Sequence, residues 1–178
     1  MKTLTVMMLL ASGSALASDK AVKERWSVIE QKFVEQRNRL KTNCGGKIPD
    51  FIDRRSFGAD IDRSVGPLAC SRLVEAVANI CTGKEDPAFN KSVLKRIKKI
   101  SCRYGGPLPK DVKEQMKSAE KPYEVPGSQL EVSLSQKGVF EWVQHYDADT
   151  EYLVFSRGDH FSEELSAFLK KELSAGTH

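Results

Sequence analysis

Apolar residues recur along one side of a helix in residues 19–44. Their steps of four, three, four, seven and four positions keep one stripe on one helical face. The stripe consists of Val22, Trp26, Ile29, Phe33, Leu40 and Cys44. Asp19 suits the N-cap and Gly45-Gly46 suits the stop. The pattern predicts an N-terminal helix with its apolar face toward a core.

Residues 67–81 predict a second, more deeply buried helix. Ser64 suits a cap, Pro67 suits a first turn, and Thr82-Gly83 ends the pattern. Apolar residues surround nearly the whole circumference, which is typical of a helix enclosed by its neighbours. They are Leu68, Leu73, Val74, Ala76, Val77, Ala78 and Ile80. We therefore expect residues 67–81 to form the central helix.

The pattern changes twice between residues 47 and 129. Residues 47–53 read as a short strand, and Pro49 favours the edge of a sheet. Residues 87–97 have helical spacing, whereas Ile100, Cys102 and Tyr104 alternate as in a strand over 98–104. Four of the seven prolines lie in 105–129, which reads as a connection with one or two helical turns near 111–120.

The last third predicts a meander of three antiparallel strands and a helix. Residues 130–134, 139–146 and 151–156 read as strands, with turns at 136–138 and at 147–150. Residues 161–173 read as a helix that closes the sheet. Large apolar groups on both faces favour a sheet covered on both sides. The fold class is α+β, with the N-terminal and central helices packed on this small antiparallel sheet.

The N-terminus indicates an exported protein. Lys2 precedes a short apolar run, and Ala15-Leu16-Ala17 fits a cleavage signal, so residues 1–17 read as a signal peptide. Residues 18–178 then form one domain, with a cysteine-containing helical part at 18–104, the proline-rich connection at 105–129 and a βββα part at 130–178. We expect a secreted or periplasmic location and no transmembrane segment in the mature chain.

Four cysteines in an exported chain predict two disulfides. Their intervals of 26, 11 and 21 residues contain no zinc-knuckle spacing. Cys70 and Cys81 would be about 16 Å apart in one helix, too far for a bond. Because the chain turns back after Gly83, we favour Cys44–Cys81 with Cys70–Cys102. The alternative that remains joins Cys44 to Cys70 and Cys81 to Cys102.

Residues 145–160 contain the densest set of side chains that could take part in catalysis or metal binding. The enzyme hypothesis is a small secreted hydrolase that uses His145 with Asp147 and Asp149, or His160 with Asp159. The spacing fits neither a calcium loop nor a phosphoryl-transfer loop, and a turn explains Asp147 and Asp149 equally well. We therefore expect no catalysis, no metal site and no cofactor.

Two surfaces compete as binding sites. The basic candidates are Lys91, Lys95, Lys98 and Arg103, and the aromatic candidates are Trp142, Tyr146 and Tyr152. Cleavage after Ala17 would remove Lys2 and no acid, which leaves 27 cations against 24 acids, and this near balance disfavours nucleic acid as a partner. We expect a binding domain that contacts a protein, an anionic polymer or an anionic membrane surface. A secreted inhibitor-type or structural envelope protein is the other alternative.

Overall fold

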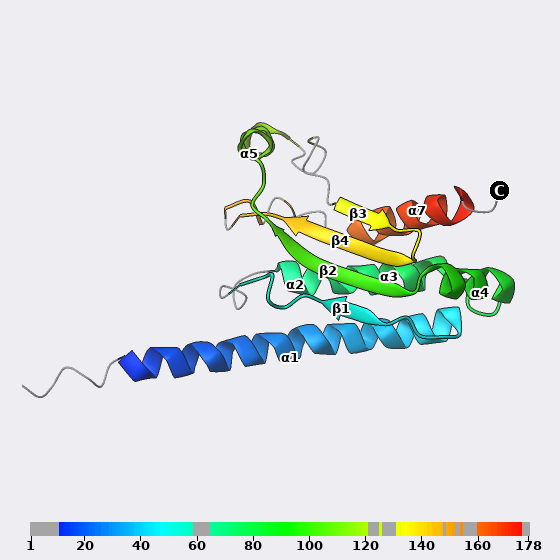
Figure 1. The fold of residues 1–178 in the computed structure, drawn as a ribbon, viewed down its shortest axis with the longest axis horizontal. Helices are drawn as coiled ribbons and strands as arrows, with labels where there is room; N and C mark the ends of the chain where they lie inside the picture. The colour runs from blue at the N-terminus through cyan, green and yellow to red at the C-terminus, as the bar shows by residue number, and fades with distance from the viewer. Residues whose placement is uncertain are drawn as a thin grey trace, which may run out of the picture.

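The structure, a computed structural model, describes residues 11–58, 65–120, 125, 131–147, 149–151, 154 and 160–175 (Figure 1). The helices are α1 Ala11–Cys44, α2 Gly66–Ala69, α3 Ser71–Ile80, α4 Pro87–Arg96, α5 Lys110–Ser118 and α7 His160–Ala175. The strands are β1 Asp50–Ile52, β2 Lys99–Gly106, β3 Glu131–Leu134 and β4 Val139–His145. The α+β class is confirmed, and the predicted helices and strands are present except for the strand at 151–156.

The sheet is mixed and four-stranded, in the order β1-β2-β4-β3. β1 pairs with β2 in parallel and β2 pairs with β4 in parallel, whereas β3 is antiparallel to β4. Asp50, Ile100 and Phe140 share one level across the three parallel strands. The predicted antiparallel pair of strands at 130–134 and 139–146 is confirmed as β3 and β4. The expectation of an all-antiparallel sheet is wrong, because β2 lies between β1 and β4, parallel to both, and joins chain segments on either side of 105–129 into one sheet.

Glu151 and Val154, the described residues of the predicted third strand at 151–156, are helical, so the strand prediction is wrong at these two positions. The Glu151 N–H donates to the Asp147 carbonyl at 2.8 Å, and the Val154 N–H donates to the Thr150 carbonyl at 3.0 Å. The Glu151 carboxylate accepts from the N–H groups of Val65 and Gly66, at the start of α2. This tertiary contact favours the helical turn, since a short apolar run by itself fits either a strand or a helix. Residues 152, 153, 155 and 156 lie outside the described part of the chain.

Two helices differ from their predicted bounds. α1 extends from Ala11, ahead of the predicted N-cap Asp19. The central helix is divided at Cys70 into α2 and α3, and Cys81 is already extended. The proposed cap Ser64 lies outside the described residues.

The core lies on one side of the sheet. The strands pass in front of α2, α3 and α7, and no described helix crosses in front of them (Figure 1). Phe140 and Trp142 on β4 are 0% exposed and face this helical layer, where the Trp142 ring packs 4.6 Å from that of Phe161. On the opposite face Lys99 and Arg103 are exposed, whereas Ser101 and Val143 are buried, so the described part of the chain covers this face only in part.

Both disulfides have the favoured pairing. Cys44–Cys81 joins the end of α1 to the residue after α3, and Cys70–Cys102 joins the α2–α3 break to β2. The Cα atoms are 5.2 Å and 5.8 Å apart. Two disulfides in a chain of four cysteines fit an extracellular or otherwise oxidising compartment. Within the described residues, no helix has the length and apolarity needed to cross a bilayer.

Candidate anion-binding surface

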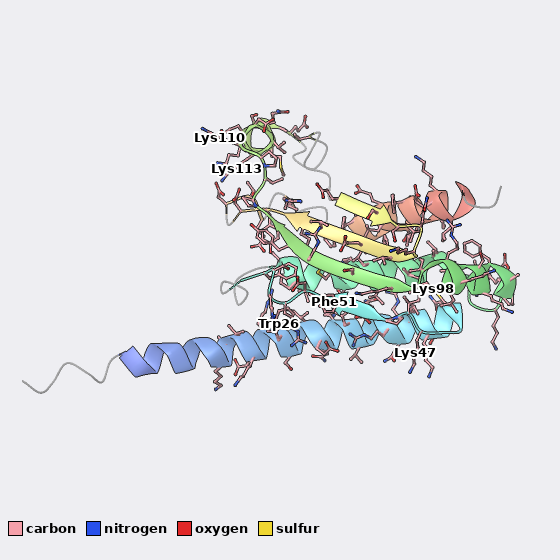
Figure 2. The ribbon with its side chains drawn as sticks, in the orientation of Figure 1. Trp26, Lys47, Phe51, Lys98, Lys110 and Lys113 are labelled. Carbon is pink, nitrogen blue, oxygen red and sulfur yellow. A yellow bond between two sulfur atoms is a disulfide. The ribbon has the colours of Figure 1, made fainter. Side chains whose placement is uncertain are left out.

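The parallel strands begin at one end of the sheet, and each beginning carries lysine. Lys47 lies three residues before β1, Lys98 directly precedes β2, and Lys137 lies two residues before β4. Because the three strands are parallel and in register, these positions gather at the same sheet end. Figure 2 labels Lys47 and Lys98 there, whereas Lys110 and Lys113 of α5 lie at the opposite end.

A hollow of about 340 Å³ lies at this end, between the last turn of α4 and the turn that joins β3 to β4. Its cationic lining consists of Lys95, Arg96, Lys98 and Lys137, which we call the basic cradle. Ser135, Gln136 and Gly138 complete the described lining, which contains no carboxylate. Four positive charges therefore surround one hollow.

The backbone beneath the basic cradle is fixed by hydrogen bonds. The N–H groups of Lys98 and Lys99 both donate to the Gly138 carbonyl, at 2.8 Å and 3.2 Å. Gly138 has a φ of +79°, and a Cβ there would collide with the Arg96 carbonyl. Glycine is thus required where the turn meets α4. The backbone is held in place while the cationic side chains remain exposed.

The cradle cations form no ion pair with another described side chain. Arg37, Arg39 and Lys113 elsewhere in the molecule are each bound by carboxylates. Lys95 and Arg96 also lie in the last turn of α4, where positive charge offsets the helix dipole. That structural role requires no ligand, but it leaves both side chains exposed at the hollow.

The structure brings together part of the predicted basic site. Lys95 and Lys98 line the cradle, and Lys91 is exposed earlier on α4. Arg103 lies farther along β2, with its Nε 3.6 Å from Glu141 Oε1, so its charge is partly neutralised. Sequence reasoning missed Lys47 and Lys137, since their proximity depends on the parallel pairing of β1, β2 and β4.

The predicted aromatic residues are not placed as a free surface. Trp142 is 0% exposed and Tyr146 is 8% exposed. The Tyr104 hydroxyl donates to the Tyr146 carbonyl at 2.8 Å, and burial raises the pKa of Tyr104 with a smaller contribution from Asp147. Tyr152 lies outside the described residues. Trp142 and Tyr146 therefore contribute to the interior packing.

Lysines of α5 bind the carboxylates of the hydrolase hypothesis. Lys113 Nζ lies 2.8 Å from Asp149 and 3.3 Å from Asp147, and Lys117 Nζ lies 3.2 Å from Asp149. The pKa of Lys113 is raised, mainly by Asp149, and the pKa of Asp149 is lowered, mainly by Lys113. These two carboxylates are held as ion pairs.

The histidines add little to the hydrolase hypothesis. His145 Nε2 is 3.8 Å from Glu131, beyond hydrogen-bond reach. His160 begins α7, and Asp159 lies outside the described residues. Within the described part of the chain, no group of three or more His, Cys, Asp or Glu side chains is arranged to hold a metal ion.

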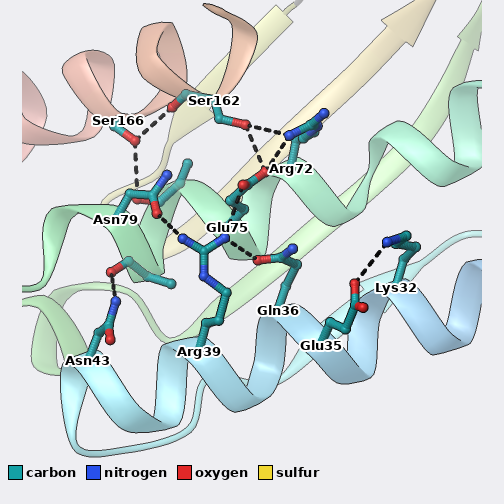
Figure 3. A network of polar contacts seen from close by, with 12 residues as sticks. Lys32, Glu35, Gln36, Arg39, Asn43, Arg72, Glu75, Asn79, Ser162 and Ser166 are labelled. Atoms are coloured by element: carbon teal, nitrogen blue, oxygen red, sulfur yellow. Dashed lines mark hydrogen bonds and ion pairs between the residues drawn. The ribbon is translucent and has the colours of Figure 1, made fainter. Parts of the chain in front are cut away.

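A polar network around Glu75 is the other concentration of charge (Figure 3). Arg39 of α1 lies 3.1 Å from Glu75, Arg72 lies 2.8 Å from it, and the Ser162 hydroxyl donates to it at 2.8 Å. A hollow of about 280 Å³ adjoins the network. Because these groups satisfy one another, the network serves to join α1, α3 and α7.

Comparison of the chain with protein-family profiles, with curated proteins and with solved structures found no match.

Proposed function

We propose that this protein is an exported, disulfide-stabilised binding domain that attaches to an anionic macromolecular surface through the basic cradle. The observation that carries the proposal is the convergence of Lys95, Arg96, Lys98 and Lys137 on one hollow whose described lining has no acid. Clustered cations attract phosphate, sulfate or carboxylate groups and gain affinity by releasing the counterions of a polyanion. The two disulfides support the exported location in this proposal.

Binding has more support than hydrolysis. Asp147 and Asp149 are bound by Lys113 and Lys117, so neither carboxylate is free to orient a histidine. The cradle has the opposite character, since its charges are exposed and form no ion pair with the described side chains. An exposed charge without a partner attracts an external ion, whereas the attraction of a paired charge is largely cancelled by its partner.

The test is salt-dependent retention on a column of immobilised heparin, which is a sulfated polyanion. We expect the wild type to bind at low salt and to elute as the salt concentration approaches the physiological range. The triple variant Lys95→Gln/Lys98→Gln/Lys137→Gln should elute earlier. For this variant the slope of log Kd against the logarithm of the salt concentration should be smaller by about two to three, roughly one for each lysine removed.

The matched control is Lys20→Gln/Lys23→Gln/Lys110→Gln, which removes the same charge from exposed positions on α1 and α5. Lys110 lies at the opposite end of the molecule from Lys98 (Figure 2). We expect the control to retain most of the wild-type slope. Absence of binding at low salt, or equal losses in both triple variants, would overturn the proposal.

A further inference from the structure

A second hollow adjoins the basic end of the sheet and differs from the cradle in being mainly apolar. It has a volume of about 500 Å³ and lies between α1 and residues 47–50. Its apolar lining consists of Val34, Leu40, Ile48 and Pro49. Leu40 and Ile48 are 2% and 6% exposed and form the deep part, whereas Val34 is 46% exposed at the surface. We call this hollow the α1 groove.

The rim of the α1 groove is cationic. Arg37 donates to both Asp50 carboxylate oxygens, at 2.8 Å and 2.7 Å, and also to Glu30. These contacts neutralise the charge of Arg37 and hold Arg37 and Asp50, which both line the groove, in place. Lys41 and Lys47 also line the groove, and neither forms an ion pair with another described side chain. The net charge offered by the rim is therefore positive, over an apolar interior.

We infer that the α1 groove holds the hydrocarbon chain of an anionic lipid, with the lipid phosphate bound by Lys41 and Lys47. This inference rests on the proposed function, because it identifies the anionic surface as a membrane. A glycan or polyphosphate has no apolar part to cover the exposed side chains of Val34 and Pro49. An acyl chain does, and a volume of about 500 Å³ is in the usual range for a small-ligand pocket.

Phe51 supports a membrane surface over a soluble polyanion. It directly follows Asp50, and 51% of its surface is exposed. Lys99 Nζ lies 4.9 Å from the centre of its ring. Figure 2 shows Phe51 on β1, next to α1. An exposed aromatic ring beside a lysine suits the boundary between lipid headgroups and acyl chains.

The direct test is calorimetric titration with dodecyl phosphate below its micelle-forming concentration. Dodecyl maltoside supplies the same chain without charge, and inorganic phosphate supplies the charge without a chain. We expect dodecyl phosphate to bind at least about tenfold more tightly than either. Shortening the chain to decyl phosphate should weaken binding by up to about fourfold per methylene that the groove buries.

Val34→Asp and Val28→Asp are matched variants for this test. Both valines lie on α1 and both are 46% exposed, but only Val34 lines the groove. We expect Val34→Asp to weaken dodecyl phosphate binding about tenfold or more, because it places a carboxylate beside the anion, and Val28→Asp to change it less than about twofold. Should Val34→Asp fail to fold, Lys41→Gln/Lys47→Gln, for which we expect a loss of similar size, provides the same test.

The outcomes separate this inference from the proposed function. Both Asp variants should still bind heparin, whereas the cradle triple variant should still bind dodecyl phosphate. Val34→Asp should weaken binding to vesicles of the anionic lipid phosphatidylglycerol. It should not change whatever binding occurs to vesicles of the zwitterionic lipid phosphatidylcholine. If heparin is retained but dodecyl phosphate binds no better than inorganic phosphate, the lipid inference is wrong and the cradle stands. The lipid inference is also wrong if the Val34→Asp variant binds dodecyl phosphate as tightly as the wild type does.

Discussion

Glu75 shows how single residues connect three helices. Burial by itself would raise the pKa of Glu75, but hydrogen bonds and charge from Arg72, Ser162 and Arg39 outweigh burial and lower it. The carboxylate is therefore more stable as an anion in the folded protein than in the unfolded chain. Since its partners come from α1, α3 and α7, its charge state affects how these helices pack.

At the residue scale, we predict that Glu75→Gln lowers the free energy of unfolding by about 1–2 kcal/mol at neutral pH, because charge-assisted hydrogen bonds become neutral. The pKa of Glu75 in the folded state lies below its ordinary value of 4.5. The stabilisation is therefore complete above about pH 4.5 and disappears as the pH falls through the lower folded-state pKa. Urea melts from pH 7 to pH 3 should show the wild type and the variant converging.

Glu35→Gln provides the control, because Glu35 forms an exposed pair with Lys32 at 2.9 Å (Figure 3). Exposed pairs of this kind contribute little to stability. We expect no resolvable change at any pH. A Glu75→Gln variant as stable as Glu35→Gln at pH 7 would contradict a structural role for the network.

At the element scale, α5 is held to the domain by two different kinds of contact. Val112 and Met116 place apolar side chains in a small second core, while Lys113 and Lys117 form ion pairs with Asp147 and Asp149. That core also contains Leu108, Val125, Tyr146 and Val154. Apolar burial should decide the stability of this region, because the ion pairs are accessible to water and screened by salt.

We predict that Met116→Ala destabilises the protein by about 2–4 kcal/mol, since Met116 is 0% exposed and its removal leaves a cavity. Hydrogen exchange should accelerate first in α5.

Asp147→Asn/Asp149→Asn should leave the melting temperature nearly unchanged, with no divalent-cation effect specific to the wild type. A larger loss from the Asn pair than from Met116→Ala would reverse this ranking, and metal-dependent melting would revive the cation site.

At the scale of the whole molecule, the disulfides connect parts that are far apart in sequence. Cys44–Cys81 spans 37 residues and joins the end of α1 to the residue after the buried helix α3, whereas Cys70–Cys102 spans 32 residues and attaches the helical layer to the sheet. The Gln144 side chain, 0% exposed, lies beside the second disulfide, with Nε2 3.3 Å from Cys102 Sγ and 2.9 Å from the Gly66 carbonyl. Sheet and helices are thus fastened at the centre of the domain.

We predict that Cys44→Ser/Cys81→Ser and Cys70→Ser/Cys102→Ser each lower the free energy of unfolding by about 4 kcal/mol, from the loop entropy restored to the unfolded chain. Reducing both disulfides should unfold a domain of ordinary stability. Chemical denaturation with and without dithiothreitol measures both effects. Proteolysis without reduction, followed by mass spectrometry, should recover linked Cys44–Cys81 and Cys70–Cys102 peptides, and a Cys81–Cys102 peptide would refute the pairing.

The sequence by itself determined features that depend on local periodicity and chain geometry. The helices at 19–44, 87–97 and 161–173 followed from spacing on one face, and Pro49 correctly indicated an edge strand. Helix geometry excluded a Cys70–Cys81 bond, and the chain reversal after Gly83 favoured the observed pairing over the one alternative that remained. Lys95 and Lys98, which lie in the most basic stretch of the chain, were predicted as binding residues, and both line the cradle.

Only the tertiary structure decided which strands pair and where the cradle forms. Ser101 and Glu141 are 40 positions apart and still adjacent across β2 and β4, and no local pattern specifies such a parallel pairing. Glu151 is helical through its bond to the start of α2, which overrides an ambiguous apolar run. Lys137 lines the cradle with Lys98, and Lys47 lies at the same end of the sheet, because the parallel strands β1, β2 and β4 begin at that end.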